Sequence, residues 1–131
     1  MTDTNITVRR AFGELVHLLQ HQSTAAITAA ADKWQWVIPF PARIVDVICN
    51  IETAGSGGVS DIIDVNLNGT TIYTTQANRP TSLVGNTGLF TEDSEPEITI
   101  LRTGDILSYD VDQVCTTGGA KFSITIVISQ R

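Results

Sequence analysis

The sequence predicts an all-β domain built as an antiparallel β-sandwich. Three observations support this prediction: runs of alternating apolar and polar residues, tight-turn signals such as Asn-Gly and Gly-Gly between the runs, and an abundance of Thr, Ile and Val. With 131 residues and 42% hydrophobic content, the chain has enough apolar surface for one core. We therefore expect one sandwich body preceded by a short N-terminal arm.

The arm is expected over residues 1–23 and the sandwich body over residues 24–131. Within residues 11–22, large apolar side chains recur at helical spacing, which predicts a short amphipathic helix. A helix of this length is only marginally stable in water, so its apolar face needs a partner surface. The candidate partner-binding residues of the arm are Phe12, Leu15, Val16 and Leu19.

The body begins with a strand whose large side chains lie on one face. Trp34 and Trp36 are two residues apart, and Phe40 follows inside a Pro-Phe-Pro sequence that ends the strand. A small domain does not easily bury three such aromatic rings alone, so we expect them to contact another subunit. The sequence therefore predicts self-association, as a homotrimer.

A hairpin is predicted over residues 61–73. Asn68 and Gly69 separate two alternating runs, and this pair favours the tight turn that needs positive φ at both positions. The same stretch resembles a calcium-binding loop, because Asp64, Asn66, Asn68 and Gly69 occupy its first, third, fifth and sixth positions. The twelfth position, which requires Glu, is Thr75. We therefore interpret the segment as a hairpin and predict no metal site.

The other strands are predicted from alternation, and they surround one long loop. Residues 76–97 contain Pro and Gly without sustained periodicity, which is typical of a loop. Asp110 and Asp112 should share one face of their strand. The predicted strands cover residues 43–52, 98–102, 106–115 and 121–129.

Charge and motif content exclude several classes of function. The formal charge is −6, and residues 34–131 carry eleven acidic against five basic residues, which argues against nucleic acid or an anionic membrane as partner. No run of eighteen apolar residues exists, and the first ten residues lack the charged start and apolar centre that are expected of a signal peptide. No nucleophile or acid–base constellation can be identified, so we expect no enzyme, no catalytic residue and no cofactor.

Four segments of the sequence share a pattern with a known family. They are Asp64-Val-Asn-Leu-Asn-Gly-Thr-Thr-Ile72, Gln76-Ala-Asn-Arg-Pro80, residues 104–114 from Gly104-Asp105 onward, and the alternating last strand. Together they resemble a family of small β-sandwich proteins found among the structural genes of tailed bacteriophages, and the resemblance covers residues 24 to the C-terminus. It implies a jelly-roll-like module used in virions, as a capsid cement or decoration protein or as a module of tail fibres.

The first expectation from this resemblance is a cement protein on the capsid exterior. It would be made in the host bacterial cytoplasm and would bind the major capsid protein, clamping neighbouring subunits. The arm favours this reading, because an apolar segment that orders on contact suits a clamp. The alternative is a tail-fibre or baseplate module that binds a receptor or carbohydrate through Trp34, Trp36, Tyr73 and the loop at residues 76–97, although aromatic content is only 6%.

Overall fold

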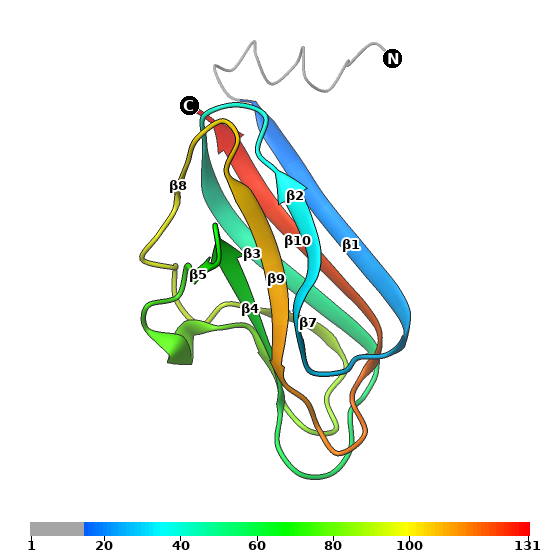
Figure 1. Cartoon of the computed structure of the whole chain (residues 1–131). Helices are drawn as coiled ribbons and strands as arrows, with labels where there is room; N and C mark the ends of the chain where they lie inside the picture. The colour runs from blue at the N-terminus through cyan, green and yellow to red at the C-terminus, as the bar shows by residue number, and fades with distance from the viewer. Residues whose placement is uncertain (1–14) are drawn as a thin grey trace.

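The computed structural model describes residues 15–131 and shows ten β-strands in two facing sheets (Figure 1). One short 3₁₀ helix, η1 (Gln76–Asn78), is the only helical segment in this part of the chain. None of its helices is long and apolar enough to cross a membrane. The strands are β1 (Val16–Ala26), β2 (Ala30–Val37), β3 (Ala42–Thr53), β4 (Asp61–Leu67), β5 (Thr70–Thr71), β6 (Thr81–Ser82), β7 (Gly88–Thr91), β8 (Ile100–Leu101), β9 (Ile106–Gln113) and β10 (Ala120–Gln130).

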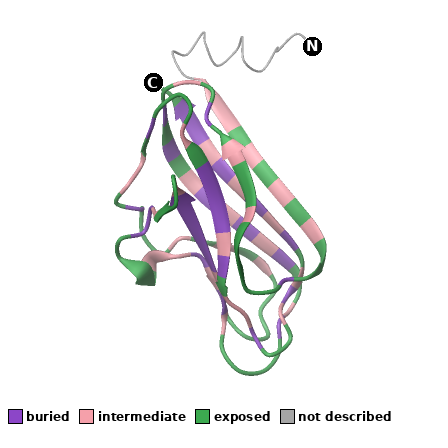
Figure 2. Ribbon diagram, viewed as in Figure 1, coloured by how far each residue is buried: buried purple, intermediate pink, exposed green. Residues whose placement is uncertain are grey.

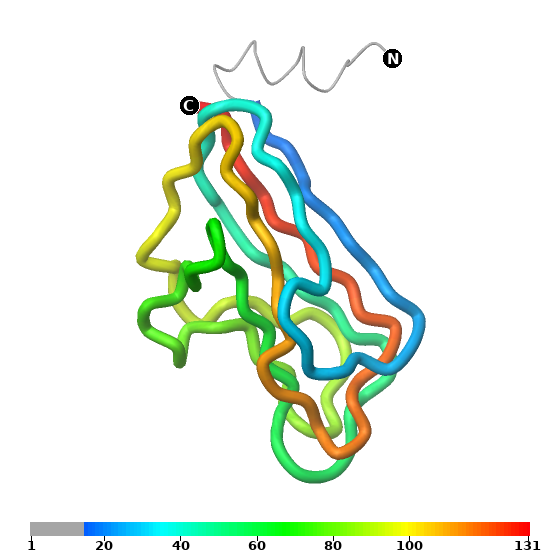
Figure 3. Tube along the Cα trace, viewed as in Figure 1, coloured from blue at the N-terminus to red at the C-terminus, as the bar shows by residue number. Residues whose placement is uncertain are grey.

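The strand order is that of a jelly roll. Sheet A has the order β1-β10-β3-β7, with β8 also paired to β3, and sheet B has the order β2-β9-β4-β5, with β6 also paired to β4. Every pairing is antiparallel, and the first four long strands enter the two sheets alternately. The trace in Figure 3 shows the chain passing between the two layers at the ends of the sandwich. The predicted antiparallel, jelly-roll-like sandwich is confirmed.

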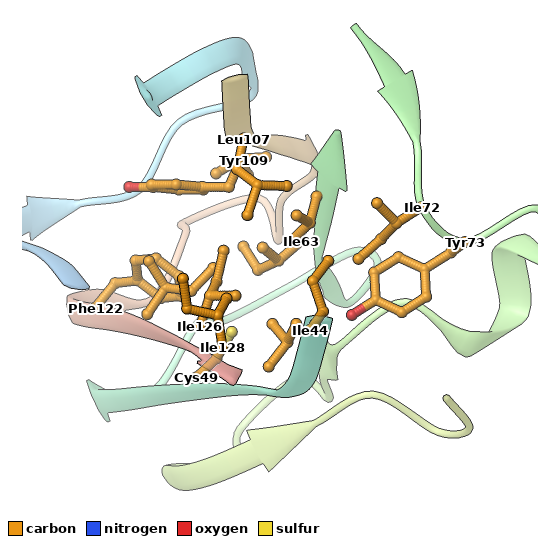
Figure 4. Close-up of a cluster of buried hydrophobic side chains, with 14 of the residues drawn as sticks. Ile44, Cys49, Ile63, Ile72, Tyr73, Leu107, Tyr109, Phe122, Ile126 and Ile128 are labelled. Carbon is orange, nitrogen blue, oxygen red and sulfur yellow. The ribbon is translucent and has the colours of Figure 1, made fainter. Parts of the chain in front are cut away.

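The core lies between the sheets and is built by alternation along each strand. In β10, the inward residues are buried while the residues between them are half-buried, so the strand is striped in Figure 2. Figure 4 shows Phe122, Ile126 and Ile128 of β10 facing Leu107 and Tyr109 of sheet B. The inward residues of β10 are Phe122, Ile124, Ile126 and Ile128.

The prediction of a helix over residues 11–22 is wrong for those of its residues that the structure describes. Residues 16–22 belong to β1, which pairs along β10 from Val16 opposite Ser129 to Ala26 opposite Ala120. Leu19 packs against the core while Leu18 is 57% exposed, which is the period of a strand. Pairing with β10 decides the conformation of this segment. The strand gains backbone hydrogen bonds to β10, whereas an isolated helix of this length is only marginally stable in water. The boundary expected between residues 23 and 24 lies inside β1.

The predicted hairpin between β4 and β5 is confirmed. Asn68 and Gly69 have φ angles of 51° and 85°, the left-handed region that this turn requires. The Asn68 side chain accepts a hydrogen bond from the Ile106 amide at 2.9 Å and donates one to Asp105 at 3.1 Å. Strands rather than helices flank the turn, so the interpretation as a hairpin instead of a calcium loop holds.

The long loop predicted over residues 76–97 contains more structure than its sequence indicates. Besides η1, it includes β6, which pairs with β4, and β7, which pairs with residues 48–51 of β3. These strands have two and four residues, too few to establish a period. They extend the sheets on the side away from β1 and β2.

Replacing a core residue of β10 should destabilise the sandwich far more than replacing its outward neighbour. We expect Ile126→Ala to lower the free energy of unfolding by about 2 to 5 kcal/mol, because it leaves a cavity between the sheets. Ser123→Ala, on the outer face of the same strand, should change it by about 0.5 kcal/mol or less. Urea denaturation followed by circular dichroism measures both values, and equal losses would contradict the described facing of β10.

Candidate functional site

Three carboxylates meet on the outer face of sheet B. Asp64 on β4 is paired with Asp110 on β9, and Asp112 lies two residues further along β9. One carboxylate oxygen from each lies within 4.8 Å of the others, so the three have the spacing of a cation site. Alternation places them here, because Val65 and Tyr109 point into the core and their neighbours therefore point outward. We call Asp64, Asp110 and Asp112 the acidic cluster.

Asp64 is the buried member of the cluster, at 5% exposure. One of its oxygens accepts hydrogen bonds from the Val65 amide at 2.8 Å and from the Thr71 hydroxyl at 2.6 Å. The pKa of Asp64 is raised to about 6, chiefly by burial and also by the nearby Asp112, while the hydrogen bond from Thr71 opposes this rise. A fraction of Asp64 is therefore protonated at mildly acidic pH.

The other two carboxylates have donors from separate parts of the chain. Asp110 accepts hydrogen bonds from the Asn66 side chain at 2.6 Å and from the Asp32 amide at 2.8 Å. Asp112 forms an ion pair with Arg79 at 2.6 Å. Each carboxylate of the cluster thus has a protein donor, and together they connect β2, β4, β9 and the segment after η1. The contacts of the acidic cluster therefore link the strands of sheet B to one another.

A half-buried carboxylate, Glu92, follows β7 and contacts a tyrosine of the core. The Tyr73 hydroxyl, which is completely buried, donates a hydrogen bond to Glu92 at 3.2 Å. Burial raises the pKa of Glu92 to about 7, and the same burial raises the pKa of Tyr73. This pair attaches the segment after β7 to the core.

The structure places the predicted contact residues of the arm in different environments. Phe12 lies outside the described residues. Leu15 and Val16 are half-buried at the start of β1, and Leu19 packs against the core of its own sandwich. Leu18, which the helical spacing left out, is the exposed large apolar residue of this strand. No signal in the sequence identifies its exposure, because apolar and polar residues do not alternate along residues 16–22.

The three predicted aromatic contact residues also lie in different environments. Trp36 and Phe40 pack against the core, whereas Trp34 remains 49% exposed. The Trp34 ring stacks on His21 of β1 at 4.6 Å, and His21 forms a hydrogen bond with the Tyr109 hydroxyl at 2.8 Å. These rings close the sandwich between β1 and β2. Of the three, only Trp34 is left with a large exposed surface.

Fold and site together define a jelly-roll β-sandwich with an acidic outer face on one sheet. No protein-family model matches the sequence, and no curated protein is significantly similar to it. Among solved structures, the chain is similar to a chain of the capsid of Ralstonia phage GP4, with a TM-score of 0.54 and 17% identity over 90% of this chain and 84% of that chain. At this identity, the similarity establishes the fold alone.

Two further solved structures have lower scores. One is a chain of the cyanophage Pam1 capsid, with a TM-score of 0.41 and 12% identity over 88% of this chain and 86% of that chain. The other is the core of Drosophila NLP, with a TM-score of 0.43 and 10% identity over 87% of this chain and 94% of that chain.

Replacing Asp64 should change how stability depends on pH. Its pKa is about 6 in the folded state against an ordinary value of 3.8, so its contribution to stability is complete below about pH 4 and is lost as pH rises through about 6. The Asp64→Asn variant has no carboxyl group at this position, so its unfolding free energy does not fall in this way as pH rises. Relative to the unaltered protein, the variant should gain on the order of 1 to 3 kcal/mol in unfolding free energy between about pH 4 and pH 7.

Glu97→Gln provides a control of opposite sign for this experiment. Hydrogen bonds from Thr75 lower the pKa of Glu97, so its contribution is present at neutral pH and is lost as pH falls. Its replacement should therefore cost more at neutral than at acidic pH. Urea denaturation across the pH range gives both differences. A constant difference between Asp64→Asn and the unaltered protein would show that the Asp64 pKa is not raised.

Proposed function

We propose that this protein is a structural protein of a bacteriophage virion, and specifically a capsid cement protein. In this proposal it binds the outer surface of the shell and clamps neighbouring major capsid subunits. The observation that carries the proposal is the jelly-roll similarity to a Ralstonia phage GP4 capsid chain, which extends over 90% of this chain. The resemblance of the hairpin and the last strands to tailed-phage structural proteins supports it independently.

The acidic cluster is consistent with a non-catalytic role. Its carboxylates are held by Thr71, Asn66 and Arg79, and these contacts connect strands to one another. A catalytic carboxylate pair would instead need one group directed at a substrate. In a cement protein, such contacts keep the body rigid while it connects its neighbours.

The tail-module alternative has less support from the structure. It requires Trp34, Trp36 and Tyr73 to form a surface on which a sugar stacks. Tyr73 is completely buried and Trp36 packs against the core, so the three rings do not form such a surface. Trp34 is already stacked on His21.

The homotrimer predicted from the sequence has also lost part of its support. That prediction assumed that Trp34, Trp36 and Phe40 all need a partner subunit. Trp36 and Phe40 pack within their own chain, so the assumption now applies to Trp34. Self-association remains part of the proposal, and three copies remain a sequence-based prediction.

Removing residues 2–14 should weaken attachment to particles without unfolding the sandwich. The deletion ends before β1, whereas a deletion of residues 2–22 would remove most of that strand. Phe12, the candidate contact in this segment, would contribute about 1.5 to 3 kcal/mol if fully buried against the shell. We expect the truncated protein to keep its β circular dichroism and to decorate particles lacking the protein less completely than the full chain.

Phe12→Ala gives the point-substitution version of this test, and Leu83→Ala is its control. Leu83 is an exposed apolar residue of a loop, so its replacement removes similar apolar surface elsewhere. Co-sedimentation of each variant with particles measures attachment. The anchoring role is wrong if the truncated protein and Phe12→Ala both bind as well as the full chain.

A further inference from the structure

The outermost strand of sheet A has one free edge. β1 has eleven residues and pairs on one side with β10, and no described strand pairs with its other side (Figure 1). At the rise of an extended chain, this edge is about 36 Å long. Along it, alternate backbone N–H and C=O groups point away from the sandwich, as they do at any sheet edge.

β1 lacks the features that normally protect an edge strand. It contains no Lys, Arg, Asp, Glu, Pro or Gly, and its one irregularity lies at the far end, between Ser23 and Ala26. Figure 2 shows it as half-buried and exposed along its whole length, with no fully buried residue. A long, regular and uncharged edge is a template for pairing with another strand.

The other edges of this sandwich are protected. β5, β6 and β8 have two residues each, and β7 has four. β2, the edge strand of sheet B, has a register shift between Ala30 and Trp34, and within it Asp32 has a positive φ of 49° and Lys33 carries a charge. Short length, irregularity and charge each oppose edge pairing. Among the described strands, β1 alone combines length, regularity and neutrality.

The surface beside β1 is neutral, although the chain is strongly acidic. The strands of sheet A contain two acidic and two basic residues, whereas those of sheet B contain five acidic residues and one basic residue. Leu18, exposed on the outer face of β1, lies beside Val127 of β10. Two copies with a net charge of −6 each therefore meet with least repulsion along β1.

We propose that β1 is the contact between two copies of this chain. The two β1 strands pair antiparallel across a two-fold axis, so that sheet A continues from one molecule into the other. Such a contact is self-complementary, as a two-fold interface must be. Two strands of this length form about ten backbone hydrogen bonds, the number found in a typical protein interface. The unit of self-association is then a dimer, in place of the trimer expected from the aromatic residues.

Two double variants test this contact. Leu18→Glu with Gln22→Glu places two carboxylates on the exposed face of β1, and in the dimer four of them would lie along one seam. Leu89→Glu with Thr91→Glu adds the same charge to exposed positions of β7, at the opposite side of the same sheet. Circular dichroism and urea denaturation confirm that each variant keeps the sandwich.

Sedimentation equilibrium of the full chain and of both variants gives the result. We expect the unaltered protein to have twice the mass of its 14.1 kDa chain, and the β7 variant to behave in the same way. The β1 variant should dissociate at least about tenfold more readily, because like charges face each other in the pair. A monomer at high concentration, a trimer, or equal weakening by both variants would overturn the proposal.

Amide hydrogen exchange locates the contact independently of mass. In the dimer, the outward amides of β1 are hydrogen-bonded to the second copy, so their exchange should slow as protein concentration rises. Amides of β7 should exchange at the same rate at every concentration. A dimer whose β1 amides exchange equally fast at all concentrations would place the contact elsewhere and would contradict the proposal.

Discussion

The position of β10 between β1 and β3 is the constraint on which the rest of the structure depends. Its inward side chains fill the centre of the core, and its two edges are both hydrogen-bonded along nearly their whole length. Once β10 is central, β1 must be extended rather than helical. The facing core residues Val65 and Tyr109 in turn set the register of β4 and β9, which brings Asp64 and Asp110 together on the outer face.

The parts of the fold that were predictable have a local signal. The turn at Asn68 and Gly69, the run that became β3 and the alternation of β10 are each visible within about ten residues of sequence. The conformation of residues 16–22 was not predictable in this way, because Leu15, Val16 and Leu19 share one face of a helix and apolar and polar residues do not alternate along this stretch. Pairing with a strand more than one hundred residues later decided it.

The acidic cluster was not predicted as a site. The sequence predicted only that Asp110 and Asp112 share one face of their strand, which agrees with their places on β9. That Asp64 lies beside them on an adjacent strand, and that Arg79 reaches Asp112 from a loop, depends on topology that alternation does not contain. The burial of Tyr73 and the exposure of Leu18 likewise depend on which neighbours cover them.

The two sheets differ in charge, and this difference fits a protein that joins neighbours. Sheet B has an acidic outer face whose carboxylates accept hydrogen bonds from the protein itself, while sheet A has a nearly neutral face and ends in β1, whose outer edge pairs with no described strand. A neutral surface loses less hydration on contact than a charged one, and an acidic surface keeps a particle soluble. Sheet A thus carries the proposed contact between copies, and the acidic face of sheet B faces solvent.

The proposed role in the shell is tested most directly by counting this chain in purified phage particles. Quantitative mass spectrometry of particles from a phage that encodes it gives its copy number relative to the major capsid protein. A cement protein should be present at a number comparable to that of the major capsid protein, because it clamps neighbouring subunits throughout the shell. A few copies per particle would indicate a tail component and would contradict the account, as would absence of the chain from the particles.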